Sequence, residues 1–266
     1  MLPILLSSLL VGCAERMVAP APAPEENPNT RWARLLRQAA TPEGTDYDLI
    51  ARNREALDNV IAWMAVHGPE SDQIRSSQEE RKIAMMANFY NAAVIHAVLE
   101  RRPIDSVQDV QIGVYRYPPN TGFFLGQTFR VDGEWVSLYY LEHQYLLGMY
   151  EEPGIHMMLN CASQGCPPLR YWTGNNLKRQ TDAHLTDFLM SERGMRKDEQ
   201  GWALTEFFRW YGDQYVDWSQ ATDLCAYLAD AVEGERKDWL TEQIGDCQPR
   251  TFPYDWSLND IRVTTD

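Results

Sequence analysis

The sequence has few basic residues for a protein that binds nucleic acid. Its 266 residues include 24 Lys and Arg against 38 Asp and Glu, which gives a formal net charge of -14 at pH 7. Binding to a phosphate backbone depends on clustered Lys and Arg. The composition therefore predicts no nucleic-acid partner, and the acidic surplus is typical of a well-solvated surface.

The sequence also lacks an apolar segment of membrane-spanning length at its start, where the apolar run is short. Residues 1–11 are far fewer than the roughly 20 that a membrane-spanning helix needs. The segment ends in Leu10-Val11-Gly12-Cys13, which resembles a bacterial lipobox, although no Lys or Arg precedes it. We expect residues 1–12 to be a lipoprotein signal peptide and Cys13 to carry acyl chains such as palmitate, which anchor the protein in a membrane.

Residues 13–30 contain little that a folded core would bury. Their Pro-rich stretch, Val18 to Pro28, is typical of an extended tether. Ala14 directly after Cys13 resembles the sorting pattern of outer-membrane lipoproteins. We therefore expect a lipoprotein of the bacterial cell envelope, at the outer membrane and facing the periplasm. Its expected partners are the membrane and an envelope protein or peptide.

Residues 31–266 are expected to form one globular domain. Tryptophans spread from Trp32 to Trp256 indicate a substantial core, and no internal repeat is present. The apolar periodicity predicts a mostly helical α+β domain with a small, largely antiparallel sheet. Helices are expected at residues 47–66, from a Ser77–Glu80 capping box to 101, 138–147, 176–190, 204–215 and 224–244, with a hairpin at 121–136 around Asp132-Gly133 and a strand at 155–159.

The cysteines predict disulfides. Apart from Cys13, the chain has Cys161, Cys166, Cys225 and Cys247. An even number of cysteines in an exported protein is typical of disulfide bonding, and four allow three pairings. The simplest pairing joins Cys161 to Cys166 and Cys225 to Cys247.

The segment from Ile155 to Pro168 contains the residues best suited to chemistry: His156, Asn160, Cys161 and Cys166. Three interpretations fit them. A Cys161–Cys166 disulfide would be structural or redox-active. A zinc site would use both cysteines with His143 and His156, but the spacing is that of no standard zinc finger, and we predict no metal and no cofactor.

The third interpretation is a cysteine nucleophile. Cys161 would attack a carbonyl group, with His156 or His143 as the base and Glu142 or Asn91 orienting that base. Backbone amides of residues 162–165 would stabilise the oxyanion. This set of residue types resembles papain-like and transglutaminase-like enzymes.

Three further residues are expected to line or support this site: Asn160, Cys166 and Tyr90. Asn91 has a simpler interpretation as well. It lies among apolar residues of its predicted helix, where an amide often ties a neighbouring loop to the helix by hydrogen bonds. We expect that loop to be the one that carries Cys161.

An ordered set of short motifs resembles one known family. The motifs are Asn88-Phe89-Tyr90-Asn91-Ala92, Ser137-Leu138 to Glu142-His143, Ile155-His156 to Asn160-Cys161, Gly165-Cys166-Pro167-Pro168-Leu169, Phe208-Arg209-Trp210-Tyr211 and Tyr254-Asp255-Trp256-Ser257-Leu258-Asn259. Between Ile83 and Asn259 they resemble the domain of unknown function 547. Members tend to have an acidic residue four places after the tryptophan that matches Trp210, where this chain has Gln214. The resemblance implies a fold and marked positions, not a reaction.

Two functions remain open from the sequence. The first is an envelope-anchored, thiol-dependent hydrolase or transferase that acts on amide or peptide bonds through Cys161. The second is a non-catalytic, disulfide-stapled module for binding or assembly in the cell envelope. A free and reactive Cys161 in the folded protein would distinguish the first from the second.

Overall fold

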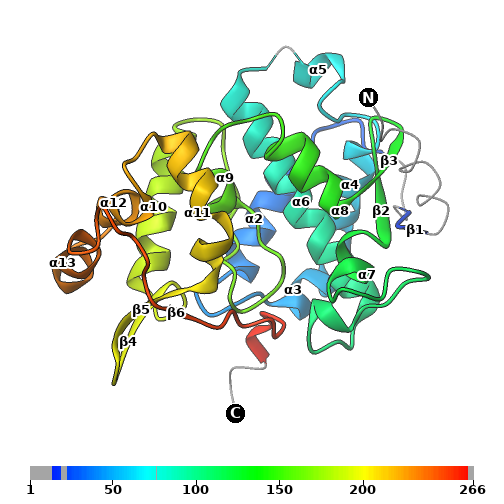
Figure 1. The fold of residues 1–266 in the computed structure, drawn as a ribbon. Coiled ribbons are helices and arrows are strands. Elements are labelled where there is room, and N and C mark those ends of the chain that lie inside the picture. Colours follow the sequence, from blue (N-terminus) through cyan, green and yellow to red (C-terminus); the bar gives the residue numbers. More distant parts are fainter. Residues whose placement is uncertain (1–13, 19–22, 76, 263–266) are drawn as a thin grey trace, which may run out of the picture.

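A 23-residue helix runs through the centre of the protein and organises the fold (Figure 1). The computed structural model describes residues 14–18, 23–75 and 77–262, so Cys13 and the expected signal peptide lie outside the described residues. Helix α6 (Glu79–Arg101) is buried almost continuously from Ile83 to Val98, as expected for a helix that is apolar around its whole circumference. By length and composition alone it could span a membrane, but most of it is buried inside the domain.

The start of α6 differs from the prediction. Gln78 is the N-cap and makes no side-chain capping hydrogen bond, so the predicted capping box of Ser77 and Glu80 is wrong. The helix begins at Glu79, which leaves Ser77 one residue before the capping position.

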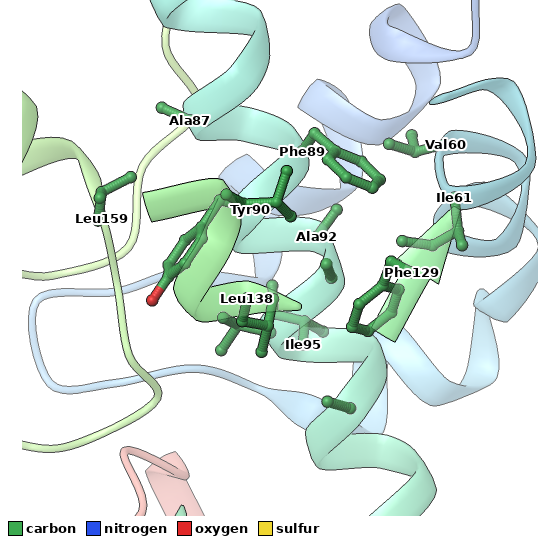
Figure 2. Packing of buried hydrophobic residues seen from close by; sticks show 14 of the residues in the cluster. Val60, Ile61, Ala87, Phe89, Tyr90, Ala92, Ile95, Phe129, Leu138 and Leu159 are labelled. Carbon is green, nitrogen blue, oxygen red and sulfur yellow. The ribbon is translucent and has the colours of Figure 1, made fainter. Parts of the chain in front are cut away.

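Four helices precede α6: α2 (Asn29–Ala39), α3 (Tyr47–Arg52), α4 (Arg54–Met64) and the short α5 (Asp72–Arg75). Helices α3 and α4 pack against α6, and α2 packs against α3 and α4. The single helix predicted over residues 47–66 is divided at Asn53, which ends α3 and precedes the first residue of α4. Figure 2 shows Phe89 of α6 pointing toward Val60 of α4, with Phe129 beside Ile61.

The first sheet lies beside these helices. It consists of β1 (Glu15–Arg16), β2 (Gln127–Val131) and β3 (Glu134–Ser137), with β1 parallel and β3 antiparallel to β2. The predicted hairpin with its Asp132-Gly133 turn is present, but it begins at Gln127. Residues before it form α7 (Thr121–Phe124), after the short 3-10 helix η2 (Val107–Asp109). Gly122 of α7 packs so closely that a Cβ there would lie 1.9 Å from the Val110 carbonyl oxygen.

Part of the segment expected to be a tether is attached to the domain. Glu15 and Arg16 pair with Gln127 and Thr128 of β2, and Glu15 also forms an ion pair with Arg101. Met17, the next residue, is buried. The described chain therefore meets the sheet directly after the position of Cys13.

Two short helical segments follow the first sheet. Ser137 caps α8 (Leu138–Tyr140), as predicted, and α8 continues into a π-helix, η3 (Leu141–Leu146). The strand predicted at residues 155–159 is wrong, because residues Ile155–Met158 form the short helix α9. All four side chains of α9 are buried, and an apolar run of this length fits a buried helical turn as well as a strand.

The carboxyl-terminal half contains α10 (Leu177–Met190), β4 (Met195–Asp198), β5 (Gly201–Thr205), α11 (Glu206–Ser219), α12 (Leu224–Ala229), α13 (Gly234–Thr241) and β6 (Thr251–Phe252). Strand β5 pairs antiparallel with β4 and parallel with β6. The helix predicted from residue 204 begins at Glu206, because Thr205 ends β5 and caps α11. The helix predicted over 224–244 is two helices.

Two hydrophobic clusters form the core. The first surrounds α6, and the second lies among α10, α11 and α12. Trp256 packs against both clusters. The predicted mostly helical α+β class is confirmed, with two small mixed sheets in place of one largely antiparallel sheet.

Candidate functional site

An aromatic cavity of about 480 Å³ lies where the two clusters meet. Tyr90 and Leu159 reach it from the first cluster, and Phe207 and Tyr254 from the second. The cavity brings together most of the site residues predicted from the sequence: Tyr90, Glu142, His143, His156, Cys161 and Cys166. Asn91 and Asn160, the two remaining predicted residues, are buried and are not among the lining residues.

Both predicted cysteine pairs lie at disulfide distance. The Cα atoms of Cys161 and Cys166 are 6.4 Å apart, and those of Cys225 and Cys247 are 5.6 Å apart. The second pair joins the start of α12 to the segment after α13. The first pair forms part of the cavity wall, where Cys161 is half-buried and Cys166 is only 2% exposed. The sulfur of Cys161 is therefore the more accessible of the two.

The hydroxyl of Tyr254 lies against this disulfide, 3.0 Å from the Sγ atom of Cys161 and 3.0 Å from that of Cys166. Burial raises the pKa of Tyr254 well above its usual range. The hydroxyl therefore keeps its proton and can donate a hydrogen bond to sulfur. A thiolate formed at either cysteine would have this donor beside it.

Buried asparagines hold the loop that carries Cys161, as predicted for Asn91. The side-chain amide of Asn91 donates to the Met158 carbonyl at 2.8 Å, and its oxygen accepts from the Asn160 backbone N–H at 2.9 Å. Asn160 in turn donates to the Pro167 carbonyl at 2.8 Å and accepts from the Ala162 N–H at 3.0 Å. Asn91 and Asn160 therefore position the loop of the nucleophile candidate from behind the cavity wall.

The carboxyl-terminal segment completes this support. Asn259 donates to Asn160 Oδ1 at 3.1 Å and accepts from the hydroxyl of Tyr47 at 2.7 Å. Its backbone N–H donates to the Ala162 carbonyl at 3.0 Å. The sequence marked the segment from Tyr254 to Asn259 only as a motif of the family resemblance, and Tyr254 and Trp256 line the cavity.

Three of the four amides proposed for an oxyanion site at residues 162–165 donate to internal acceptors. Within this described loop, the N–H of Ala162 donates to Asn160, that of Gln164 to the Ser257 carbonyl at 2.8 Å, and that of Gly165 to the Asp255 carbonyl at 2.8 Å. These groups hold the loop against the carboxyl-terminal segment. Because their hydrogen atoms point at internal acceptors, they do not face the cavity as a group.

His156 lies among aromatic rings. Its ring stacks on Tyr211 with centroids 4.3 Å apart and on Trp218 at 5.6 Å, and its Nε2 atom has no hydrogen-bond partner among the described residues. Burial lowers the pKa of His156 from 6.5 to about 3, and a side-chain hydrogen bond with Gln214 opposes that shift. The imidazole is therefore neutral at pH 7, with a buried ring nitrogen unused.

Gln214 is a site residue that sequence reasoning noticed only as a departure from the family pattern. It lies on α11 and interacts with His156, the residue that an acid at this position would orient. The other missed residues, Trp210, Tyr211 and Phe207, come from the same helix and line the cavity. The Phe208-Arg209-Trp210-Tyr211 motif was the available signal for Trp210 and Tyr211.

Glu142 and His143 enter the cavity from the π-helix η3, whose Leu147 N–H donates to the Glu142 carbonyl at 2.8 Å. Single π-helical turns within helices occur frequently at functional sites. Glu142 accepts a hydrogen bond from the Tyr90 hydroxyl at 2.8 Å. Burial raises the pKa of Glu142, while the neighbouring His143 and the bond from Tyr90 act in the opposite direction.

The four residues considered for zinc do not form a ligand set in this arrangement. Among the described residues, the one group of three or more His, Cys, Asp or Glu whose ligand atoms converge within 4.8 Å is Asp223, Cys225 and Cys247. Both cysteines of that group are paired in a disulfide, so neither offers the thiolate that zinc binds.

Comparison with known proteins gives one family match, over part of the chain. No curated protein and no solved structure is significantly similar to this chain. The expected likeness to papain and transglutaminase folds therefore remains a prediction. The family described as "Protein of unknown function, DUF547" matches residues 74–189, which include Asn91, Glu142, His156 and Cys161. This match confirms the resemblance to that family over those residues, while the motifs at 208–211 and 254–259 lie outside it.

Proposed function

We propose that the protein is a thiol-dependent hydrolase or transferase that acts on amide or peptide bonds, with Cys161 as its nucleophile. The observation that carries the proposal is that one cavity contains Cys161 together with His156, His143 and Glu142. A nucleophile, a base and a residue that can orient that base, in one partly enclosed site, are suited to acyl transfer.

The reaction begins from the dithiol form. A thiol reductant opens the Cys161–Cys166 bond and is itself oxidised to a disulfide. The Cys161 thiolate then attacks the substrate carbonyl, and the leaving amine takes the proton that the histidine received from the thiol. The resulting thioester is resolved by water, which gives an acid, or by a second amine, which gives a new amide. Each route regenerates the Cys161 thiol.

His156 can act as the base if its charge is coupled to that of the Cys161 thiolate. A neutral histidine with a pKa of about 3 is a weak base at neutral pH. A negative sulfur nearby would favour the charged imidazole and raise that pKa. His156 therefore becomes effective once the disulfide opens, and His143 is the other candidate because it lines the same cavity.

The test is to reduce the purified protein and follow the alkylation of Cys161 by iodoacetamide between pH 5 and 9. Alkylation faster than that of a free cysteine, and slowed by His156→Gln or His143→Gln, is expected. The reduced protein is then screened with fluorogenic peptide amides, with Cys161→Ala as the control. Unenhanced alkylation together with equal turnover by Cys161→Ala would refute the proposal.

A second candidate function is a disulfide-stapled binding or assembly module. The pairing of Cys161 with Cys166 and the buried asparagines that fix their loop favour it. If the disulfide is purely structural, loss of either cysteine should lower the free energy of unfolding by the same amount. If Cys161→Ala and Cys166→Ala destabilise the oxidised protein equally, and no thiol reactivity appears on reduction, this function replaces the first.

We also propose that the domain is held at the envelope membrane by a lipid on Cys13. The Leu10-Val11-Gly12-Cys13 pattern supports this proposal. If Cys13 is lipidated, β1 would keep the edge of the first sheet within a few residues of the bilayer, because Glu15 already pairs with β2. Labelling of cells with a fatty-acid analogue should mark the wild type and not Cys13→Ala. Equal labelling of both would contradict the anchor.

A further inference from the structure

Glu142 is a half-buried carboxylate that has no positively charged partner among the described residues. It accepts a hydrogen bond from the Tyr90 hydroxyl and forms no ion pair with Lys or Arg in the part of the chain that the structure describes. Other shielded carboxylates in the protein are paired: Asp260 lies 2.9 Å from Arg102 and Asp58 lies 2.8 Å from Arg54. Carboxylates removed from water are ordinarily neutralised in this way. Glu142 therefore has an unmet preference for a positive partner.

The walls around Glu142 favour the same kind of partner. Of the described residues that line the cavity, eight are Phe, Tyr or Trp and none is Lys or Arg. The faces of aromatic rings attract cations, most strongly those of Trp and Tyr. The chain also carries a net charge of -14. An anionic ligand would therefore be repelled, while a cation would be attracted by both the walls and the whole molecule.

We propose that this cavity binds the ammonium group of a lysine-type side chain, with the Glu142 carboxylate as counter-ion and the aromatic rings around the methylene stem. In the acyl-transfer function proposed above, on which this inference builds, the side chain belongs to the substrate peptide. The volume of about 480 Å³ is within the range of small-ligand sites.

An ammonium fits better than a guanidinium. An arginine side chain binds carboxylates most strongly through two parallel hydrogen bonds, which need both oxygens. The Oε2 atom of Glu142 already accepts from Tyr90. A compact ammonium can bond to the remaining oxygen, and its apolar stem can pack against Trp210 and Tyr211.

The ionisation of Glu142 is consistent with a site that waits for a cation. Burial raises the pKa of Glu142, and the titratable groups that face it are His143, Tyr90, Tyr211 and Tyr254. None of these supplies a permanent positive charge. A bound ammonium would favour the carboxylate form and lower that pKa again.

The test is isothermal titration calorimetry on the oxidised full chain, in which Cys161 is not a free thiol and no turnover contributes. The probes are Nα-acetyl-lysine N-methylamide, its norleucine counterpart, and n-butylammonium. The lysine probe should bind about tenfold or more tightly than the norleucine probe, because a charged hydrogen bond is added to the same stem. It should also bind more tightly than n-butylammonium, which lacks the peptide groups.

Two variants and a control make the result specific. Glu142→Gln should remove the preference for lysine over norleucine. Trp210→Leu, at a side chain that is 42% exposed, should weaken binding without affecting the fold. Glu199→Gln removes one negative charge at an exposed turn and should leave binding unchanged.

The inference is overturned if no probe binds, if norleucine binds as tightly as lysine, or if Glu142→Gln binds like the wild type. Binding of n-butylammonium as tightly as the lysine probe would overturn the assignment to a peptide. Because the oxidised protein is used, a failure of catalysis at Cys161 would leave this binding result intact.

Discussion

Gly165 lies directly against the ring of Tyr254, so that a Cβ atom at residue 165 would come within 2.7 Å of Tyr254 Cε2. The same ring carries the hydroxyl that contacts the sulfurs of Cys161 and Cys166. The absence of a side chain at residue 165 therefore fixes where the hydroxyl sits.

Replacing Gly165 with alanine should displace the Tyr254 ring. We expect a loss of about 1 to 3 kcal/mol in the free energy of unfolding, typical of overpacking a filled core. Reduction of the Cys161–Cys166 bond by dithiothreitol should also become faster, because the ring that covers the sulfurs has moved. Gly212→Ala is the matched control, since its Cβ would meet only the end of the Leu224 side chain at 3.2 Å. Equal behaviour of the two variants would show that the contact is unimportant.

Asn91→Ala should destabilise the protein by about 2 to 4 kcal/mol, measured by urea denaturation. The side chain is 1% exposed, and its removal leaves the Met158 carbonyl and the Asn160 N–H without their partners. The same variant should slow alkylation of reduced Cys161, because the loop loses its attachment to α6. Asn175→Ala, at an exposed position, should change neither quantity. A loss below about 1 kcal/mol for Asn91→Ala would contradict the supporting role.

The role of Asn91 was predictable from the sequence because it depends on local pattern. An amide among apolar residues of a long helix must find buried partners, and the nearest loop with marked residues contained Cys161. The same kind of pattern predicted α6, the Asp132-Gly133 turn, the Ser137 cap and both cysteine pairs. Each of these features is set by residues close together in the chain or by the number of cysteines.

The features that the sequence did not predict depend on distant parts of the chain. The residues of α9 are all buried, so their pattern carries no period that would separate a helix from a strand. The cavity wall made by Trp210, Tyr211 and Tyr254 forms only when α11 and the carboxyl-terminal segment pack beside the loop of Cys161. The oxyanion prediction failed at Gln164 and Gly165 for the same reason, since their acceptors on Ser257 and Asp255 lie about 90 residues later in the chain.

Stability should fall in acid because of His156. Its pKa lies below that of the unfolded chain, so the unfolded state takes up the proton first. The stabilising contribution is therefore present above pH 6.5 and is lost as the pH falls toward about 3. For a side chain that is 3% exposed, the full loss is about 4 to 5 kcal/mol.

The variant His156→Phe checks this expectation, because it keeps a ring for stacking on Tyr211 and cannot titrate. The difference in unfolding free energy between wild type and variant, measured by denaturant titration at several pH values, should shrink or reverse as the pH falls from 6.5. A difference that stays constant with pH would mean that His156 is not held neutral by the fold.

Gln214→Glu should replace the amide partner of His156 with the acid that the family resemblance leads us to expect at this position. A carboxylate beside the imidazole favours its charged form, so the pKa of His156, followed by NMR, should rise from about 3 by one or more units. Because a charged histidine also favours a thiolate, alkylation of reduced Cys161 should become faster at pH 6 to 7. Gln200→Glu adds the same charge at an exposed turn and should alter neither measurement. If the pKa rises while the alkylation rate does not, His156 is not the base for Cys161, and His143 takes that role.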